Sequence, residues 1–233
     1  MIPLTRPYFP DRSVKKICEA ISEVLNSGNL MLGKWTKKFE DSFSIKFGHK
    51  YSITTNTGTT ALQISLKYFD VKGYDVLVPS GSFQTNISTI KWTGGNPVFV
   101  DMNPNTLSFC LDDLKRKITS KTKGIVWVHV TGVISKEYKE IIKFAKTNNL
   151  FIIEDCAHAH GSSIDNIQAG SIGDVGCFSF YPSKVMTTGT GGMLVTENSD
   201  LANYAKSMRV LGRNLNGEGV VLEGNDWFMD EIR

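Results

Sequence analysis

Two hydrophobic patterns alternate between residues 49 and 213. Short runs rich in Val, Ile and Phe, bounded by Gly, Pro, Asn or Asp, predict strands, whereas apolar residues at three-and-four spacing predict helices. The predicted strands are 51–55, 75–79, 97–101, 124–130, 151–154, 176–180 and 193–196, and the clearest helices between them are 59–69 and 137–147. Nearly continuous apolar strands separated by helices indicate an α/β fold with a mainly parallel sheet covered on both faces.

Two amphipathic helices are predicted ahead of this core. The first covers residues 14–25 and starts with Asp11 or Ser13 as its N-cap. The second covers residues 36–47 and ends at Gly48, a residue type that is common at helix C-termini. The chain then divides into three parts: an N-terminal segment (1–48), the sheet core (49–213) and a final stretch that begins as a linker (214–233).

Composition narrows the classes of function. Twenty-six basic residues against 23 acidic ones leave a net charge of +3, too small for a general nucleic-acid or membrane-surface binder. We interpret the one dense basic run as a solvated helix face: Lys115, Arg116, Lys117, Lys121 and Lys123. The sequence lacks a signal-peptide core and any apolar run of about 18 residues, and its four cysteines form no CxxC pair. We expect a cytoplasmic protein with reduced thiols.

Polar residues that follow strands are candidates for a site, because ligands of open α/β sheets bind beyond the carboxyl ends of the strands. After strand 51–55, the segment 56–60 leads into a helix and predicts an anion site, although Thr59 would serve equally well as a plain N-cap. After strand 75–79, Phe83 fits either a lid that stacks on an aromatic ligand or an ordinary core position.

The most polar cluster of the chain runs from Glu154 to His160 and follows strand 151–154. One interpretation is a divalent metal site formed by His158, His160 and Asp155. A second is that Asp155 is a buried carboxylate that binds a protonated ring nitrogen, with His158 beside it. A third is that these are core groups whose hydrogen bonds are satisfied within the fold.

Lys184 follows strand 176–180 and the Tyr181-Pro182 pair, where proline cannot donate a ladder hydrogen bond. Such a lysine is either a solvated charge or an amine in a dry pocket, where desolvation lowers its pKa and makes it a nucleophile toward carbonyls. Pyridoxal phosphate chemistry requires a lysine, a carboxylate for the pyridine nitrogen, an aromatic face and donors for a phosphate. All four occur here, each after a different strand, whereas a metal site explains neither the lysine nor the 56–60 turn.

Several longer segments resemble one known family. They are 154–161, 169–184 and 187–192, together with Ile2-Pro3-Leu4, the Gly58-Thr59 turn and 97–101. These segments resemble the DegT/DnrJ/EryC1/StrS family of sugar aminotransferases. The resemblance implies the large domain of a three-layer type I (aspartate aminotransferase-like) fold, pyridoxal 5'-phosphate (PLP) as cofactor, and a homodimer. It also implies transfer of an amino group, usually from glutamate, to a nucleotide-linked keto-sugar in amino-sugar or surface polysaccharide biosynthesis.

The resemblance assigns a role to each candidate residue by its position. Lys184 would hold the cofactor covalently and shuttle protons, Asp155 would pair with the pyridine nitrogen, and His158 would lie beside the ring. Phe83 would stack on the ring. The phosphate would be held by Gly58, Thr59, Thr60 and Ser179.

The sequence departs from the family pattern in several places. Thr190 stands where Glu is common, and Asp226 and Phe228 stand where Asn and Arg are usual. That Asn reaches the phosphate in the partner subunit, so an Asp would bring like charges together. The chain also stops at Arg233, within what resembles a helix, whereas the family continues into a smaller C-terminal domain. We therefore expect an incomplete chain that lacks this small domain.

Two alternatives share the same fold. A regulatory relative would keep the pocket and bind its ligand without turnover, which Asp226 and the absent small domain favour. A sugar dehydrase would also resemble the family, but such proteins have histidine at the position of the lysine. Lys184 argues against the dehydrase.

Overall fold

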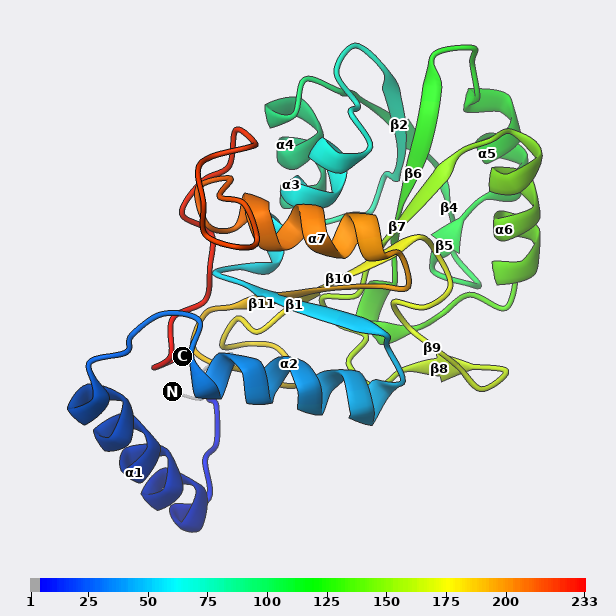
Figure 1. Ribbon diagram of the computed structural model, residues 1–233. Helices are drawn as coiled ribbons and strands as arrows, with labels where there is room; N and C mark the ends of the chain where they lie inside the picture. The colour runs from blue at the N-terminus through cyan, green and yellow to red at the C-terminus, as the bar shows by residue number, and fades with distance from the viewer. Residues whose placement is uncertain (1–4) are drawn as a thin grey trace.

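The structure is a computed structural model that describes residues 5–233, so the Ile2-Pro3-Leu4 segment of the resemblance lies outside the described residues. A seven-stranded sheet forms its centre (Figure 1). In spatial order the strands are β1 (Tyr51–Thr55), β11 (Gly192–Thr196), β10 (Val175–Ser179), β7 (Phe151–Asp155), β6 (Thr122–Val128), β2 (Asp75–Pro79) and β3 (Asn96–Val100). Strand β11 is antiparallel to both of its neighbours, and the other pairs are parallel. The prediction of a mainly parallel α/β sheet is confirmed.

Helices cover both faces of the sheet and enclose two cores. The face that we call the α2 face carries α2 (Lys34–Phe47), α5 (Leu111–Lys117) and α6 (Tyr138–Thr147). The opposite α3 face carries α3 (Gly58–Tyr68), α4 (Gln84–Trp92) and α7 (Ser199–Met208). Alternate strand residues enter opposite cores, as Ile152 and Ile153 of β7 do. Outside the sheet lie two hairpins and a 3-10 turn: β4–β5 (Met102–Asn103, Ser108–Phe109), β8–β9 (Ser163–Ile164, Ile167–Gln168) and η1 (Val130–Gly132).

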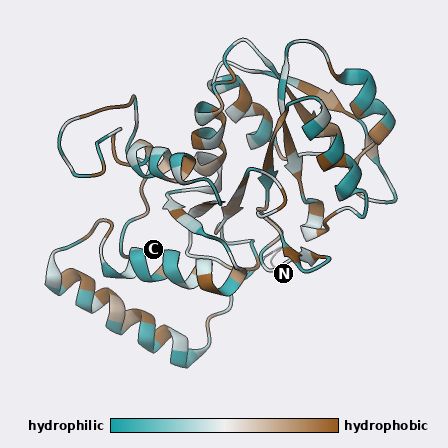
Figure 2. Ribbon diagram, turned by 45° about the vertical axis from the view of Figure 1, so that its right-hand side comes forward, coloured by the Kyte–Doolittle hydropathy of each residue, from teal (hydrophilic) through white to brown (hydrophobic). Residues whose placement is uncertain are grey.

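Helix α1 (Asp11–Ser27) stands apart from the sheet (Figures 1 and 2). Val24 is buried, but three other residues of the predicted apolar stripe are 42–58% exposed: Ile17, Val14 and Leu25. The helix therefore forms as predicted, while much of its apolar stripe remains without a covering element among residues 5–233.

The predicted N-cap of α1 is wrong. Pro10 occupies the cap position, and its carbonyl accepts hydrogen bonds from the N–H groups of Ser13 and Val14. Asp11 is instead the first residue of the helix. Proline fixes φ at a value compatible with a helix start, and the Asp11 carboxylate in the first turn interacts favourably with the helix dipole.

The segment before Arg233 is not the helix that the sequence predicts. Asp230 pairs with Met31 in an isolated antiparallel bridge, and Glu231 turns toward the start of α2. The Glu231 carboxylate accepts hydrogen bonds from three backbone N–H groups: Gly33 (2.8 Å), Trp35 (2.7 Å) and Thr36 (2.9 Å). A carboxylate there satisfies N–H groups that have no acceptor within the helix. These bonds hold the segment in a non-helical conformation.

The basic run predicted as one solvated helix face is only partly on a helix. Lys115, Arg116 and Lys117 are exposed on α5, but Lys121 lies in the following turn and Lys123 in β6, so the basic run is not a single helix face. The Lys123 Nζ donates to the carbonyl of Asp70 (2.6 Å). Within residues 5–233, no helix has the length and apolar character needed to cross a bilayer, and all four cysteines are free.

Candidate active site

A cavity of about 710 Å³ lies at the carboxyl ends of β6, β7 and β10, next to the start of α3. Seven of the eight residues that the resemblance assigns to a cofactor site line it: Gly58, Thr59, Phe83, Asp155, His158, Ser179 and Lys184. The eighth, Thr60, is buried and does not line the cavity. The cavity thus collects residues that follow four different strands, as the sequence predicts.

The turn between β1 and α3 presents the start of a helix to the cavity. Its N-cap is Thr57 rather than Thr59, and the Thr57 hydroxyl accepts a hydrogen bond from the Thr60 N–H (3.1 Å). The N–H groups of Gly58 and Thr59 have no acceptor among residues 5–233 and lie at the positive end of the helix dipole. A Cβ on Gly58 would lie 2.8 Å from the Ser179 Cβ, so this close approach of α3 to β10 requires glycine. The turn can therefore bind an anion.

Lys184 enters the cavity from the turn that follows β10. Its backbone N–H donates to the Tyr181 carbonyl (2.9 Å) across Pro182, which closes the turn. Burial lowers the pKa of the half-buried ammonium, and the nearby charge of Asp155 partly opposes this shift. A lower pKa increases the fraction of neutral amine, which is the nucleophilic form.

Asp155 is 5% exposed, and its carboxylate is held by two donors. Oδ1 accepts a hydrogen bond from the Ala157 N–H (3.0 Å), and Oδ2 accepts one from Nδ2–H of Asn86 (2.7 Å). His158 lines the same cavity, where burial and the charge of Lys184 lower its pKa. The site thus offers an anionic acceptor for a protonated ring nitrogen, with a neutral imidazole nearby.

Phe83 and Thr190 line the cavity from two other loops. Phe83 is 67% exposed and directly precedes α4, so the core alternative for this residue is wrong. The Thr190 hydroxyl donates to the carbonyl of Asn56 (3.3 Å). The Asn56 N–H in turn donates to the Trp227 carbonyl (2.8 Å), next to the exposed Asp226. Thr190 and the 226–227 segment therefore support the turn before α3 in the same chain.

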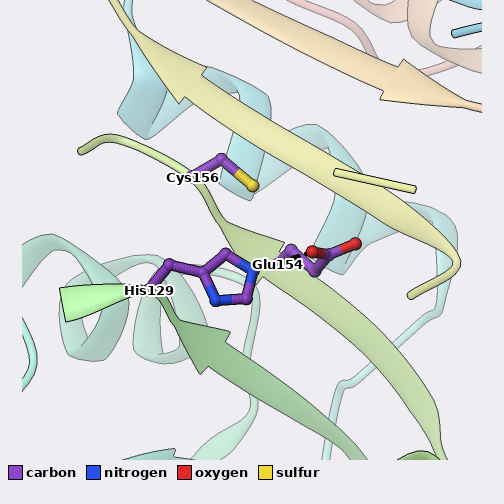
Figure 3. A group of neighbouring side chains, drawn as sticks. All are labelled: His129, Glu154 and Cys156. Atoms are coloured by element: carbon purple, nitrogen blue, oxygen red, sulfur yellow. Dashed lines mark hydrogen bonds and ion pairs between the residues drawn. The ribbon is translucent and has the colours of Figure 1, made fainter. Parts of the chain in front are cut away.

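Glu154 lies beside His129 and Cys156 (Figure 3) and belongs to a buried hydrogen-bond network on the α2 face. Its carboxylate accepts a hydrogen bond from Nε2–H of His129 (2.7 Å) and three from backbone N–H groups: Gly170 (3.0 Å), Ile172 (2.7 Å) and Gly173 (2.7 Å). Glu154, His129 and Cys156 form the one cluster in residues 5–233 whose ligand atoms approach within 4.8 Å of one another as a metal site would require. Both carboxylate oxygens are already occupied, and burial raises the pKa of the Cys156 thiol. Donors of the protein itself therefore saturate the Glu154 carboxylate, which makes it a core anchor rather than a metal ligand. The buried Nδ1 of His129 has no hydrogen-bond partner among residues 5–233.

The geometry does not support the metal site suggested for His158, His160 and Asp155, because these three residues do not converge as ligands within the described chain. The ring of His160 packs against Phe178 and Phe180, with centroids 5.4 and 5.6 Å apart. Burial lowers the pKa of His160 to about 4. His160 is thus a neutral member of the core on the α2 face.

Sequence reasoning missed two residues at this edge of the sheet, His129 and Asn86. His129 directly follows β6, so the rule that identified Asp155 also applies to it. Asn86 lies three residues after Phe83 in the first turn of α4 and follows no strand directly. Only the packing of α4 on the sheet brings Asn86 to Asp155.

Comparison with known proteins places these motifs in a family. The DegT/DnrJ/EryC1/StrS aminotransferase family matches residues 11–232. The chain belongs to this family. Similar proteins include GDP-perosamine synthase of Escherichia coli O157:H7, 34% identical over 92% of this chain. Another is dTDP-3-amino-3,6-dideoxy-alpha-D-galactopyranose transaminase of Aneurinibacillus thermoaerophilus, 36% identical over 95% of this chain. The chain spans 57% and 61% of the lengths of these two proteins.

The fold of this DegT/DnrJ/EryC1/StrS family member also matches solved structures. The PLP form of Spr1654 from Streptococcus pneumoniae is similar with a TM-score of 0.89 and 26% sequence identity. The match covers 99% of this chain and 64% of Spr1654. The predicted three-layer type I fold is therefore confirmed.

Proposed function

We propose that this chain carries the PLP site of a transaminase that moves an amino group from glutamate to a keto carbon of a nucleotide-linked sugar. The observation that carries the proposal is the convergence of Lys184, Asp155 and the start of α3 in one cavity. These groups match the three parts of PLP: an amine for its aldehyde, a carboxylate for its ring nitrogen and an anion site for its phosphate. The residues present therefore fit the cofactor.

When bound, PLP supplies an electron sink that allows an amino group to leave one carbon skeleton and be delivered to another. In this proposal Asp155 accepts the hydrogen bond of the protonated ring nitrogen, and Phe83 covers a face of the ring. Lys184 moves protons at the reacting carbon, and neutral His158 lies beside the ring. The phosphate is held by Gly58, Thr59 and Ser179.

The names of the relatives support the substrate class. GDP-perosamine synthase and the dTDP-linked transaminase are named for nucleotide-linked amino sugars, so we place this chain in amino-sugar or surface polysaccharide biosynthesis.

Exposed apolar residues of α1 support a homodimer, because such surface marks interaction sites. The four free cysteines within residues 5–233 support a reducing compartment, the cytoplasm.

Absorbance tests the cofactor assignment. Apoprotein mixed with PLP should develop the visible band of the lysine-bound cofactor, and Lys184→Ala should not develop it. The control Lys91→Ala removes an exposed lysine of α4 and should keep the band. A wild-type protein that develops no band with saturating PLP would refute the proposal.

Glutamate separates a transaminase from a regulatory relative. A transaminase should lose the visible band when glutamate is added, since the amino group passes to the cofactor, and should regain it with a keto acceptor. An unchanged spectrum would favour the regulatory alternative, which keeps the pocket without turnover.

A further inference from the structure

Asn86 is a buried amide that holds the carboxylate of Asp155 from the side of α4. Its side chain is 0% exposed, and its Nδ2 donates to Oδ2 of Asp155 over 2.7 Å. The other oxygen of Asp155 accepts the Ala157 N–H. Each oxygen of this carboxylate thus receives one donor from the protein and keeps lone-pair capacity for the cavity.

The orientation of the Asn86 amide is determined by its neighbour. If the amide turned over, its oxygen would face the Asp155 carboxylate, and two acceptors would repel each other. In the observed orientation the Asn86 Oδ1 is buried with no hydrogen-bond partner among residues 5–233. A buried unpaired acceptor destabilises the fold, so stability of the fold alone does not account for an asparagine at this position.

We propose that Asn86 is a positioning residue that keeps the Asp155 carboxylate aimed at the ring nitrogen of the cofactor. The inference rests on the proposed PLP site. A hydrogen bond from a fixed donor to each carboxylate oxygen sets the rotation of the carboxylate group. Asn86 and the Ala157 N–H supply two such donors.

Asn86 also connects Asp155 with the loop that carries Phe83. Its backbone N–H donates to the Phe83 carbonyl (3.0 Å), which closes the first turn of α4. One residue therefore contacts the two groups that would meet the edge and the face of the ring. Removing the side-chain amide should affect only the contact of Asp155 with the ring nitrogen, because the backbone bond to Phe83 remains.

Two ligands distinguish positioning from a general structural role. PLP has the ring nitrogen, whereas 1-deaza-PLP has a C–H group in its place and cannot donate a hydrogen bond to Asp155. We would titrate both ligands into the apoproteins of the wild type and Asn86→Leu, a change that keeps the branched shape of the side chain but removes the donor. Asn86→Leu should weaken PLP binding by about tenfold and change the affinity for 1-deaza-PLP by less than about twofold.

The matched control is Thr89→Val on the same helix. Thr89 is also 0% exposed, and its hydroxyl bonds only to the carbonyls of Thr85 and Asn86 within α4. This variant should leave both affinities unchanged. If Asn86→Leu does not fold, Asn86→Ala takes its place, because the ratio of the two affinities is measured on one protein and does not depend on its stability.

The outcomes separate this inference from the proposed function. An equal loss of affinity for both ligands in Asn86→Leu would show a structural role, and no loss for either would show no role; both results overturn the inference and leave the PLP site intact. A wild-type apoprotein that binds neither ligand would overturn the proposed function and the inference together.

Discussion

Glu154 and Asp155 are neighbours at the end of β7, yet they lie on opposite faces of the sheet and differ in use. On the α2 face, each oxygen of Glu154 accepts two hydrogen bonds, and the side chain has no exposed surface. On the α3 face, each oxygen of Asp155 accepts one, and the residue lines the cavity. A buried carboxylate whose lone pairs are filled anchors the fold, whereas one with open lone pairs can bind a ligand.

The largest expected effect is at Glu154, on the α2 face. Glu154→Gln should lower the free energy of unfolding by about 3–5 kcal/mol, because an amide NH2 would face groups that are themselves donors. Urea denaturation measures the change, with Glu140→Gln on the exposed surface of α6 as the control. A loss below about 0.5 kcal/mol, the range of an ordinary surface change, would show that Glu154 is not an anchor.

His160, which lies on the same α2 face, should make the stability of the protein depend on pH. Its pKa in the folded protein is about 4, below the usual 6.5, because of burial. Between these values the unfolded chain binds a proton that the folded chain does not. Stability is therefore full above pH 6.5, falls as the pH drops from 6.5 to 4, and loses no more from this group below 4. The loss is at most about 3 kcal/mol.

The variant His160→Phe tests this assignment by chemical denaturation at several pH values. The slope between pH 6.5 and 4 should become smaller than in the wild type. It should not vanish, because burial also lowers the pKa of His49, which remains. An unchanged slope would assign the acid sensitivity to other groups.

On the α3 face, Asp155→Asn should affect PLP binding more than it affects folding. PLP affinity should fall by about 10- to 100-fold as the ionised acceptor is lost. The free energy of unfolding should change by less than about 1 kcal/mol, since the amide oxygen still accepts the Ala157 N–H and the Asn86 amide can turn its unpaired Oδ1 toward the new NH2 group. Stability lost on the scale expected for Glu154→Gln would break the contrast between the two carboxylates.

The smallest effect is expected at Phe83, which lines the cavity from the loop before α4. Phe83→Leu should weaken PLP binding by about two- to tenfold, the value of one aromatic contact, without changing stability, because the side chain is 67% exposed. Phe99→Leu replaces a 48% exposed ring on β3 that does not line the cavity, and it should leave PLP affinity unchanged. Equal effects of the two substitutions would argue against ring stacking.

The sequence predicts regular elements best where both ends carry strong signals. Strands β1 and β2 match their predicted ranges to the residue, and α2 ends at Gly48 as predicted, with this glycine in the left-handed conformation. The start of α1 and the segment before Arg233 are wrong for different reasons: a local contact decides the first, and a contact with a distant part of the chain decides the second. Pro10 supplies a carbonyl at the first, and Glu231 binds the N-terminus of α2 at the second.

The candidate site shows the same limit. Position after a strand identifies Asp155 and Lys184, since strand ends converge at one edge of a parallel sheet. The position of a residue after a strand does not predict that the Thr60 side chain bonds to the N-cap residue Thr57, or that Asn86 reaches Asp155. Both contacts depend on how the helices pack on the sheet. The neighbours Glu154 and Asp155 differ only in the face to which they point, which the sequence leaves unassigned.

The bonds from Gly33, Trp35 and Thr36 to Glu231 have a consequence for synthesis of the protein. The acceptor is 195 to 198 positions later in the chain than the donors. At about 5–20 residues per second, a ribosome needs roughly 10–40 s to cover that distance. Throughout this interval the nascent α2 has its first-turn N–H groups open to water. The helix on which β1 rests therefore receives this cap only after Glu231 has been synthesised.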